Sequence, residues 1–272
     1  MTDYGNLLLD AVQCAREAGK IHLSYFRKGN YSIEAKHGNE SDIVTSADKA
    51  AETAIINFIH THYPAHSILS EESGSEVHDA EYTWVIDPLD GTTNFSSGLP
   101  MFSVSIGIMH HGTTVVGVVY APYLGEMFHA VQGEGAFLNG ERITCGTRQS
   151  LGQCVVATGF PVDKDINPDC NLDNVAHVLP HVRGLRRLGS AAIDISYVAA
   201  GYLDAYWELN LHEWDVCAGL LIAHEAGAEF HHFRHDRNIS VLVASPAISA
   251  LMLPLLSGEP CRHAIASVDG NK

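Results

Sequence analysis

Basic residues are scarce in this chain of 272 residues, where 16 Lys and Arg stand against 32 Asp and Glu and the formal charge is −16. Affinity for a nucleic-acid backbone comes mainly from clustered Lys and Arg, so a nucleic-acid partner is disfavoured. Intrinsic disorder is excluded as the main state, because 46% of the residues are hydrophobic. An acidic protein that binds a phosphorylated ligand needs local positive charge, and divalent metal ions are the obvious source.

The chain also lacks the cysteine patterns of several protein classes. Its six cysteines include no Cys-x-x-Cys pair, and the closest two, Cys145 and Cys154, are nine positions apart. This spacing excludes a zinc knuckle and a redox-active pair, so we expect reduced thiols. The first residues, Met1 to Tyr4, show no basic segment followed by an apolar one. No signal peptide is therefore visible, and we expect a cytoplasmic protein.

Motifs of nucleotide-binding and serine-hydrolase sites are absent as well. No G-x-x-x-x-G-K loop and no G-x-S-x-G motif occurs, and the Gly-Glu-Gly at residues 133–135 lacks the third glycine of a dinucleotide-binding loop. The uncharged stretch at residues 239–256 contains Pro246 and Pro254. It predicts a buried strand and then a helix that begins at Pro246, rather than a membrane span.

What is present is a layered pattern of helices and strands. Apolar residues recur at helical spacing over residues 3–28 and 46–62, and residues 82–143 are rich in strand and hairpin signals. After a soft boundary near residue 146, strands and helices alternate. We predict layered α+β and α/β structure, with residues 1–146 and residues 147–272 as two halves of one compact unit.

The clearest chemical signal is a pair of aspartates, Asp87 and Asp90, at the end of an apolar strand. Pro88 and Gly91 predict a turn from this strand into a helix. Two carboxylates so close repel, so either one has a raised pKa or both bind a cation such as Mg²⁺, which prefers oxygen ligands. The N–H groups at the start of the following helix favour an anion. An Asp-Pro turn with a capping aspartate explains the pair equally well.

Two other acidic positions fit the same picture. Glu71 and Glu72 follow a short apolar strand, and Asp215 follows Trp214 at the start of an apolar helix. Taken alone, the glutamates are explained by a solvated turn and Asp215 by its interaction with the helix dipole.

Five blocks in the same order resemble the inositol monophosphatase family over roughly residues 5–256. Residues 84–95 (WVIDPLDGTTNF) and residues 214–219 (WDVCAG), the latter followed by Glu-Ala-Gly, resemble its two signatures. Three shorter matches, at residues 42–48, 69–73 and 133–140, complete the five blocks, and residues 189–192 match as well. The resemblance implies a stacked αβαβα sandwich of the sugar-phosphatase type and hydrolysis of a phosphomonoester.

The resemblance also implies a site for two or three Mg²⁺ ions. The first ion would be bound by Glu71, Asp87 and the backbone carbonyl of Leu89. The second would be bound by Asp87, Asp90 and Asp215, and Glu71 would hold a third, looser ion through waters. Such ions lower the pKa of bound water and neutralise charge on the transferring phosphoryl group.

The same resemblance assigns catalytic and phosphate-binding roles. The Thr92 hydroxyl, paired with Asp48, would help Glu71 to orient and deprotonate the attacking water. Backbone N–H groups of Gly91 and Thr92 would bind the phosphate. We prefer Glu71 to Glu72 because it is the first acid after the strand and matches the ligand position of the family.

The predicted substrate is a small phosphorylated polyol, inositol monophosphate. The resemblance implies that Glu208 and residues 189–191 face the alcohol half of the substrate. A carboxylate accepts hydrogen bonds from two vicinal hydroxyls, so Glu208 suits a polyol ring. The predicted substrate-binding residues are Glu71, Leu89, Asp90, Gly91, Thr92, Gly189, Ser190, Ala191 and Glu208. Inhibition by Li⁺ and a homodimer are further expectations from the resemblance.

Other substrates remain open: histidinol phosphate, fructose 1,6-bisphosphate or a 3′-phosphonucleotide. Relatives that act on nucleotides usually carry Lys-Glu after the Asp-Gly-Thr, and Thr93-Asn94 stands there instead. Some bacterial relatives bind the transcription machinery, and the basic cluster of Arg183, Arg186 and Arg187 could serve such a protein partner, a subunit interface or simply the solvated surface.

Residues 228–236 depart from the family pattern, because the second glycine and the hairpin aspartate are missing. His231, His232 and His235 in this segment suggest an exposed polar turn rather than a metal site.

Overall fold

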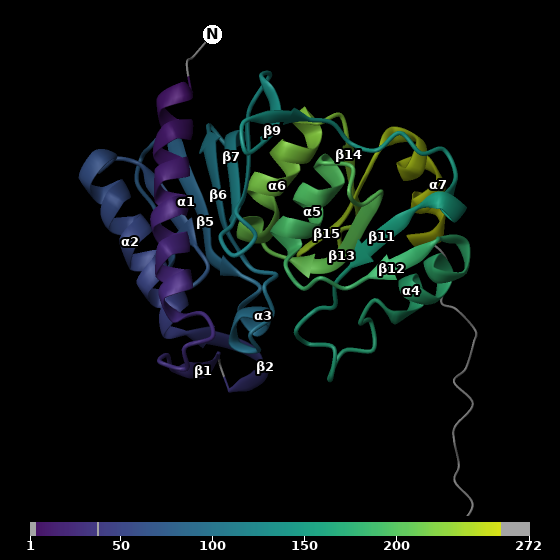
Figure 1. Cartoon of the computed structure of the whole chain (residues 1–272), viewed down its shortest axis with the longest axis horizontal. Helices are drawn as coiled ribbons and strands as arrows, with labels where there is room; N and C mark the ends of the chain where they lie inside the picture. The colour runs from purple at the N-terminus through teal and green to yellow at the C-terminus, as the bar shows by residue number, and fades with distance from the viewer. Residues whose placement is uncertain (1–3, 37, 257–272) are drawn as a thin grey trace, which may run out of the picture.

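The computed structural model describes residues 4–36 and 38–256 as five stacked layers (Figure 1). A pair of helices covers one face of an eight-stranded sheet, a second pair lies between this sheet and a five-stranded one, and two further helices cover the far side. The predicted αβαβα sandwich is confirmed, in which each helix buries its apolar stripe against a sheet. Within the described ranges, no helix is both long and apolar enough to cross a membrane.

The outer helices are α1 (Gly5–Tyr25) and α2 (Ser46–His62), close to the bounds that their apolar spacing predicts. A two-stranded ribbon of β1 (Ile33–Lys36) and β2 (Asn39–Thr45) connects them. Helix α2 starts with a capping box, in which the N–H of Thr45 donates to Asp48 Oδ2 at 3.0 Å. Such bonds satisfy backbone donors that a helix start leaves unpaired.

The eight-stranded sheet has the order β10-β9-β8-β7-β6-β5-β3-β4. Its strands pair antiparallel, except that β3 and β5 run parallel. Their bounds are β3 (Ser67–Ser70), β4 (Gly74–Glu76), β5 (Tyr82–Asp90), β6 (Ser103–His110), β7 (Thr113–Ala121), β8 (Glu126–Val131), β9 (Gly135–Leu138) and β10 (Glu141–Ile143). The short helix α3 (Thr92–Ser96) follows β5.

The central helices α5 (Ala191–Ala199) and α6 (Glu213–Glu225) pack against the inner face of this sheet. Helix α6 approaches so closely that a Cβ atom at Gly117 of β7 would lie 2.6 Å from the carbonyl oxygen of Ala218. Only glycine fits there without a shift of backbone. This contact fixes the start of α6, and with it Asp215 in its first turn, relative to the sheet.

The five-stranded sheet has the order β12-β11-β13-β15-β14, with β11 parallel to both β12 and β13 and the other pairs antiparallel. Its outer face is covered by α4 and by α7, which begins at Pro246 as predicted. The bounds are β11 (Val155–Thr158), α4 (Leu172–Val178), β12 (Gly184–Arg186), β13 (Ala205–Leu211), β14 (Glu229–Arg234), β15 (Ile239–Ala244) and α7 (Pro246–Leu256), with 3₁₀ turns at Leu151–Gln153 and Leu179–His181.

The turn predicted at Pro88 is wrong. Strand β5 does not stop before Asp87 but continues to Asp90 through a bulge, since Asp87 pairs with Ser105 and Asp90 with Ser103. Pro88 lies inside this bulge, where the missing N–H of proline costs no ladder hydrogen bond. A bulge bends a strand and changes the direction of its side chains, so it turns both aspartates toward one site.

The predicted polar turn at residues 228–236 is also wrong. Residues 229–234 form the edge strand β14, in which His231 pairs with Leu242 of β15 and His232 with Val241. Backbone pairing to the buried strand β15 outweighs the local polarity of the segment. His231, His232 and His235 form no metal-binding group among the described residues.

A small aromatic cluster closes the end of α1 near the bulge. His22 is fully buried and packs edge-on against Phe95 and Phe102, with ring centroids 6.1 and 6.0 Å away. Burial lowers the pKa of His22 to about 3, and contact with the backbone of Pro88 opposes this only partly. The imidazole is therefore neutral in the folded protein over the whole physiological pH range.

We predict that acidification destabilises the wild type more than the His22→Leu variant. The unfolded chain protonates this histidine below pH 6.5 whereas the folded chain does not until about pH 3. Stability is therefore unaffected above pH 6.5 and is lost progressively as the pH falls toward 3. Between pH 8 and pH 5, the free energy of unfolding falls by about 2 kcal/mol because of this residue. Urea unfolding at both pH values measures it, with the exposed His62→Leu as the control. Equal losses in wild type and His22→Leu would contradict the prediction.

Candidate active site

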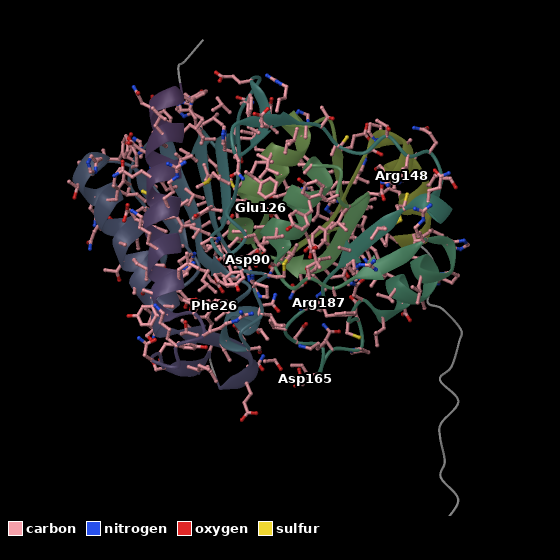
Figure 2. All side chains as sticks on the ribbon, viewed as in Figure 1. Phe26, Asp90, Glu126, Arg148, Asp165 and Arg187 are labelled. Atoms are coloured by element: carbon pink, nitrogen blue, oxygen red, sulfur yellow. The ribbon has the colours of Figure 1, made fainter. Side chains whose placement is uncertain are left out.

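A cavity of about 470 Å³ opens where residues of both sheets and the starts of α5 and α6 meet. Asp90, at the end of β5, and Arg187, just after β12, are labelled in Figure 2, and both line this cavity. All the predicted metal and substrate residues line this cavity: Glu71, Asp87, Leu89, Asp90, Gly91, Thr92, Gly189, Ser190, Ala191, Glu208 and Asp215. Asp48, predicted to be catalytic, is fully buried and lies behind Thr92.

The bulge of β5 presents Asp87 and Asp90 in different surroundings. Asp87 Oδ1 accepts the backbone N–H of Leu89 at 3.0 Å, which closes the bulge on itself. Asp90 Oδ2 reaches the other half of the chain, where it accepts the Ser190 hydroxyl at 2.5 Å and the backbone N–H of Ala192 at 2.8 Å. Asp90 thus binds the start of α5, where the helix dipole favours a negative charge.

The Gly91-Thr92 segment joins the bulge to α3. Gly91 has φ 90°, and a Cβ atom there would lie 2.8 Å from the carbonyl oxygen of Met101. Both the backbone conformation and this steric contact therefore exclude a side chain at this position. The Thr92 hydroxyl donates to Asp48 Oδ1 at 2.9 Å and also lies 3.0 Å from the Leu89 carbonyl oxygen. The predicted pairing of Thr92 with Asp48 is therefore present in the geometry.

Glu71 follows β3 and is held by a residue that the sequence did not single out. Lys36, at the end of β1, lies 2.7 Å from Glu71 and 2.7 Å from Glu72. Only Glu71 of these two glutamates lines the cavity. No local pattern links Lys36 to an acid 35 positions later in the chain, so the contact becomes visible only in the fold.

Asp215 is the third residue of α6 and forms its capping box. Its Oδ2 accepts the backbone N–H of His212 at 2.6 Å. The ring of His212 stacks on Trp214, with centroids 4.7 Å apart and planes at 9°. Asp215 thus both interacts with the start of α6 and lines the cavity. Its interpretation as a helix-capping charge and its interpretation as a metal ligand are therefore compatible.

The opposite wall of the cavity carries the residues expected to face the alcohol half of a substrate. Glu208 in β13 accepts the Tyr206 hydroxyl at 2.5 Å, and burial, only partly opposed by this bond, raises the pKa of Glu208 to about 7. Asp194 of α5 and Arg187 line the cavity beside it. Both were missed as cavity residues. Arg187 was grouped with Arg183 and Arg186, although its position two residues before Gly189 was a usable signal.

The electrostatics of the cavity favour a cation. Seven carboxylates line it, against the cationic side chains of Lys36 and Arg187 and the imidazole of His212, whose pKa is raised by its contact with Asp215. Burial, reinforced by neighbouring carboxylates, raises the pKa of Asp87 well above its usual range, and burial raises the pKa of Asp90 to about 7. Burial also raises the pKa of Glu71, although Lys36 opposes the shift. A hard divalent cation would compensate these charges, and an all-oxygen donor set of this kind fits Mg²⁺.

The predicted ligands surround the cavity rather than converge on a single point. In the described part of the chain, three metal-ligand atoms that all lie within 4.8 Å of one another occur at Glu81, His110 and His111 instead. Within the cavity each predicted carboxylate is bonded to a protein group, as with Lys36 on Glu71 and Ser190 on Asp90.

The layers and the acidic cavity define a phosphatase fold of the stacked αβαβα type. The chain belongs to the inositol monophosphatase family, whose sequence profile matches residues 5–258. It is 40% identical over 254 residues to the Nus factor SuhB of Escherichia coli K12, with 92% of this chain and 95% of that protein covered.

Two solved structures show the same fold. The extragenic suppressor protein suhB from Bartonella henselae superimposes with a TM-score of 0.86 at 35% identity, over 93% of this chain and 98% of that one. An inositol monophosphatase from Anabaena superimposes with a TM-score of 0.83 at 35% identity, over 94% of this chain and 96% of that one.

We predict that Asp90→Asn and Asp215→Asn each raise the melting temperature in EDTA and shrink the further rise caused by Mg²⁺. Each change removes a negative charge from a set that repels in the absence of a cation, and it also weakens the metal site. Thermal unfolding with EDTA and with 10 mM MgCl₂ measures both effects. Asp79→Asn, at an exposed position, is the matched control. A wild-type response to Mg²⁺ in both cavity variants would refute the assignment of these ligands.

Proposed function

We propose that the protein is a Mg²⁺-dependent phosphomonoesterase that hydrolyses inositol monophosphate to inositol and phosphate. One observation carries the proposal: the bulge of β5, the end of β3 and the start of α6 bring Asp87, Asp90, Glu71 and Asp215 to a single cavity. Membership of the inositol monophosphatase family supports this reaction.

The residues proposed to bind metal divide into two sets. Glu71, Asp87 and the Leu89 carbonyl would hold one ion, and Asp87, Asp90 and Asp215 a second, with Glu71 also near a third. Mg²⁺ ions bound there would neutralise the phosphoryl charge and lower the pKa of a water molecule. Because Li⁺ is a small, hard cation with one charge fewer, we expect millimolar Li⁺ to inhibit by occupying the second set.

The residues around the phosphate act by position and by proton transfer. The backbone N–H groups of Gly91 and Thr92 are proposed to bind the phosphate oxygens. The Thr92 hydroxyl, fixed by Asp48 at 2.9 Å, orients the attacking water. Glu71, whose pKa is raised by burial, is suited to accept the proton of that water. Lys36 keeps the Glu71 carboxylate in one orientation.

The opposite wall sets the choice of alcohol. The buried Glu208 carboxylate is proposed to accept hydrogen bonds from two vicinal hydroxyls, next to Gly189, Ser190 and Ala191. A site built to bond a hydroxyl strongly rejects an analogue without one, because the buried acceptor is left unpaired.

We predict that Thr92→Ala lowers kcat by at least ~10-fold and leaves KM within about twofold. The backbone N–H at this position still binds phosphate, while the lost hydroxyl orients a water whose position matters mainly in the transition state. Steady-state phosphate release measures both constants. Thr92→Ser, which keeps the hydroxyl, should retain most of the activity. A higher KM at an unchanged kcat would contradict the role of Thr92 and Asp48.

We predict that Glu208→Gln weakens hydrolysis of myo-inositol 1-phosphate by ~10-fold or more and spares glycerol 2-phosphate, which has fewer hydroxyls to bind. The ratio of kcat/KM for the two substrates is the measurement. Equal losses on both substrates, or no loss on either, would remove Glu208 from the specificity site.

The identity of the substrate has its own test. A phosphate-release screen of the wild type with Mg²⁺ compares inositol 1-phosphate with histidinol phosphate, fructose 1,6-bisphosphate and a 3′-phosphonucleotide. The proposal expects inositol 1-phosphate to have the highest kcat/KM. A higher kcat/KM for histidinol phosphate would overturn the assignment of inositol monophosphate as the substrate and leave the proposed metal chemistry in place. Thr93-Asn94 disfavours the nucleotide, and the Asn94 side chain is already bonded to the Met101 and Leu188 carbonyls at 2.7 Å.

A second candidate function is binding to the transcription machinery. It is suggested by the name Nus factor SuhB of the relative described above and by Arg183 and Arg186, which lie exposed outside the cavity. Binding of purified RNA polymerase to wild type and to Arg186→Glu would test it, with phosphatase activity as the control for folding. The predicted homodimer, for which Arg183 and Arg186 are one candidate interface, is tested by light scattering of the wild type and of Arg186→Glu without RNA polymerase.

A further inference from the structure

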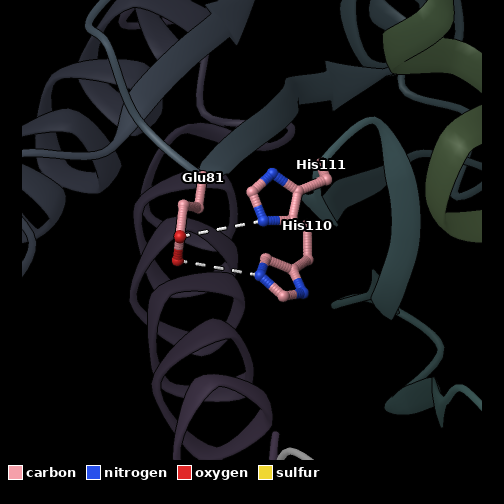
Figure 3. A group of neighbouring side chains, drawn as sticks. All are labelled: Glu81, His110 and His111. Atoms are coloured by element: carbon pink, nitrogen blue, oxygen red, sulfur yellow. Dashed lines mark ion pairs between the residues drawn. The ribbon is translucent and has the colours of Figure 1, made fainter.

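A group of metal-ligating side chains lies at the end of β5 that is remote from the cavity. Glu81 precedes β5, His110 ends β6, and His111 begins the turn to β7. Both imidazoles face the Glu81 carboxylate (Figure 3), with His110 Nε2 and His111 Nε2 each 3.8 Å from one of its oxygens. One ligand atom from each residue lies within 4.8 Å of the other two.

The backbone explains why two consecutive residues face the same group. Successive side chains of a strand point to opposite faces. Here His111 has φ 49° and Gly112 has φ 77°, the values of a primed two-residue hairpin turn, which brings the His111 ring to the side of His110. The N–H of His111 donates to the carbonyl oxygen of Glu81 at 2.8 Å, so the turn is fixed directly opposite Glu81.

The ring of His110 is held from two other directions. Its Nδ1 lies 3.1 Å from the hydroxyl of Tyr4, and its face stacks on Tyr82 with centroids 4.5 Å apart and planes at 11°. When Nδ1–H donates to the Tyr4 oxygen, Nε2 carries the lone pair and points to Glu81. Metal-binding histidines are commonly oriented in this way by a partner on the other ring nitrogen.

We propose that Glu81, His110 and His111 bind one Zn²⁺ ion. Zinc–ligand bonds of 2.0–2.2 Å in tetrahedral geometry place ligand atoms about 3.3 Å apart. The two 3.8 Å contacts go to different oxygens of the Glu81 carboxylate, and one ligand atom from each residue lies within 4.8 Å of the other two, so binding needs a closure of up to about 1.5 Å. Glu81 and His111, whose side chains are 67% and 64% exposed, are free to make this movement while the stacked His110 stays in place.

The donor set separates this site from the active site. Two imidazole nitrogens and a carboxylate suit zinc, whereas Mg²⁺ prefers oxygen ligands alone. Asp87 lies six residue steps along an extended strand from Glu81, so the two sites are roughly 20 Å apart. Zinc bound here would join the start of β5 to the β6–β7 turn and, through Tyr4, to the start of α1. We therefore expect it to stabilise the fold without taking part in hydrolysis.

Calorimetric titration of the full, tag-free chain with ZnCl₂ in the presence of 5 mM MgCl₂ tests the site. The matched variant is His111→Asn, because asparagine also suits the primed turn. We expect wild type to bind one more equivalent of zinc than His111→Asn and Glu81→Gln, or to bind it at least tenfold more tightly. Zinc should also raise the melting temperature of wild type more than that of either variant, while the rise caused by Mg²⁺ stays equal.

The control is a second His-Glu-His group, in which His60 and His78 contact Glu76 at 3.0 and 2.9 Å. His78→Asn should bind zinc as wild type does. Equal zinc stoichiometry and affinity in wild type, His111→Asn and Glu81→Gln would overturn the proposal. A loss in His78→Asn as large as in His111→Asn would also overturn it, because binding would then be a general property of surface histidines.

Discussion

Carboxylates crowded around one cavity are the constraint on which the rest of the structure depends. Burial of a charged carboxylate costs free energy, and neighbouring carboxylates add repulsion. Both effects are visible in the raised pKa of Asp87. The fold reduces this cost by placing acids at the starts of helices: Asp48 in the capping box of α2, Asp215 in that of α6, and Asp90 on the N–H of Ala192 in α5. The positive end of each helix dipole then faces a negative group.

The same contacts hold the acids in place. Asp90 ends β5 of the eight-stranded sheet and is hydrogen-bonded to the start of α5, which precedes β13 of the five-stranded sheet. These bonds join the two halves of the chain at the cavity. Asp48 in turn fixes the Thr92 hydroxyl, and Lys36 fixes Glu71. Groups held in this way need little rearrangement when a substrate binds, and phosphoryl transfer depends mainly on such positioning. Close packing of α6 at Gly117 serves the same end, because it sets where Asp215 enters the cavity.

Much of this arrangement was predictable from the sequence, and the exceptions have physical causes. Helix α2 was found from its apolar spacing, and the αβαβα layering followed from the family resemblance. The bulge at Pro88 was mistaken for a turn, because the same residues suit both, and only pairing with Ser103 and Ser105 decides between them. Strand β14 was missed because its polar residues gain their strand conformation from β15. Lys36 was missed because its contact with Glu71 joins residues 35 positions apart and leaves no local pattern.

The central claim is that carboxylates of both halves form one metal-binding phosphatase site. Crystals soaked with Mn²⁺ and inorganic phosphate, measured for anomalous scattering, test it most directly. We predict peaks within about 2.2 Å of oxygen atoms of Asp87, Asp90 and Asp215, with phosphate beside the N–H groups of Gly91 and Thr92. An absence of peaks in the cavity at saturating Mn²⁺, or peaks confined to Glu81, His110 and His111, would contradict the account.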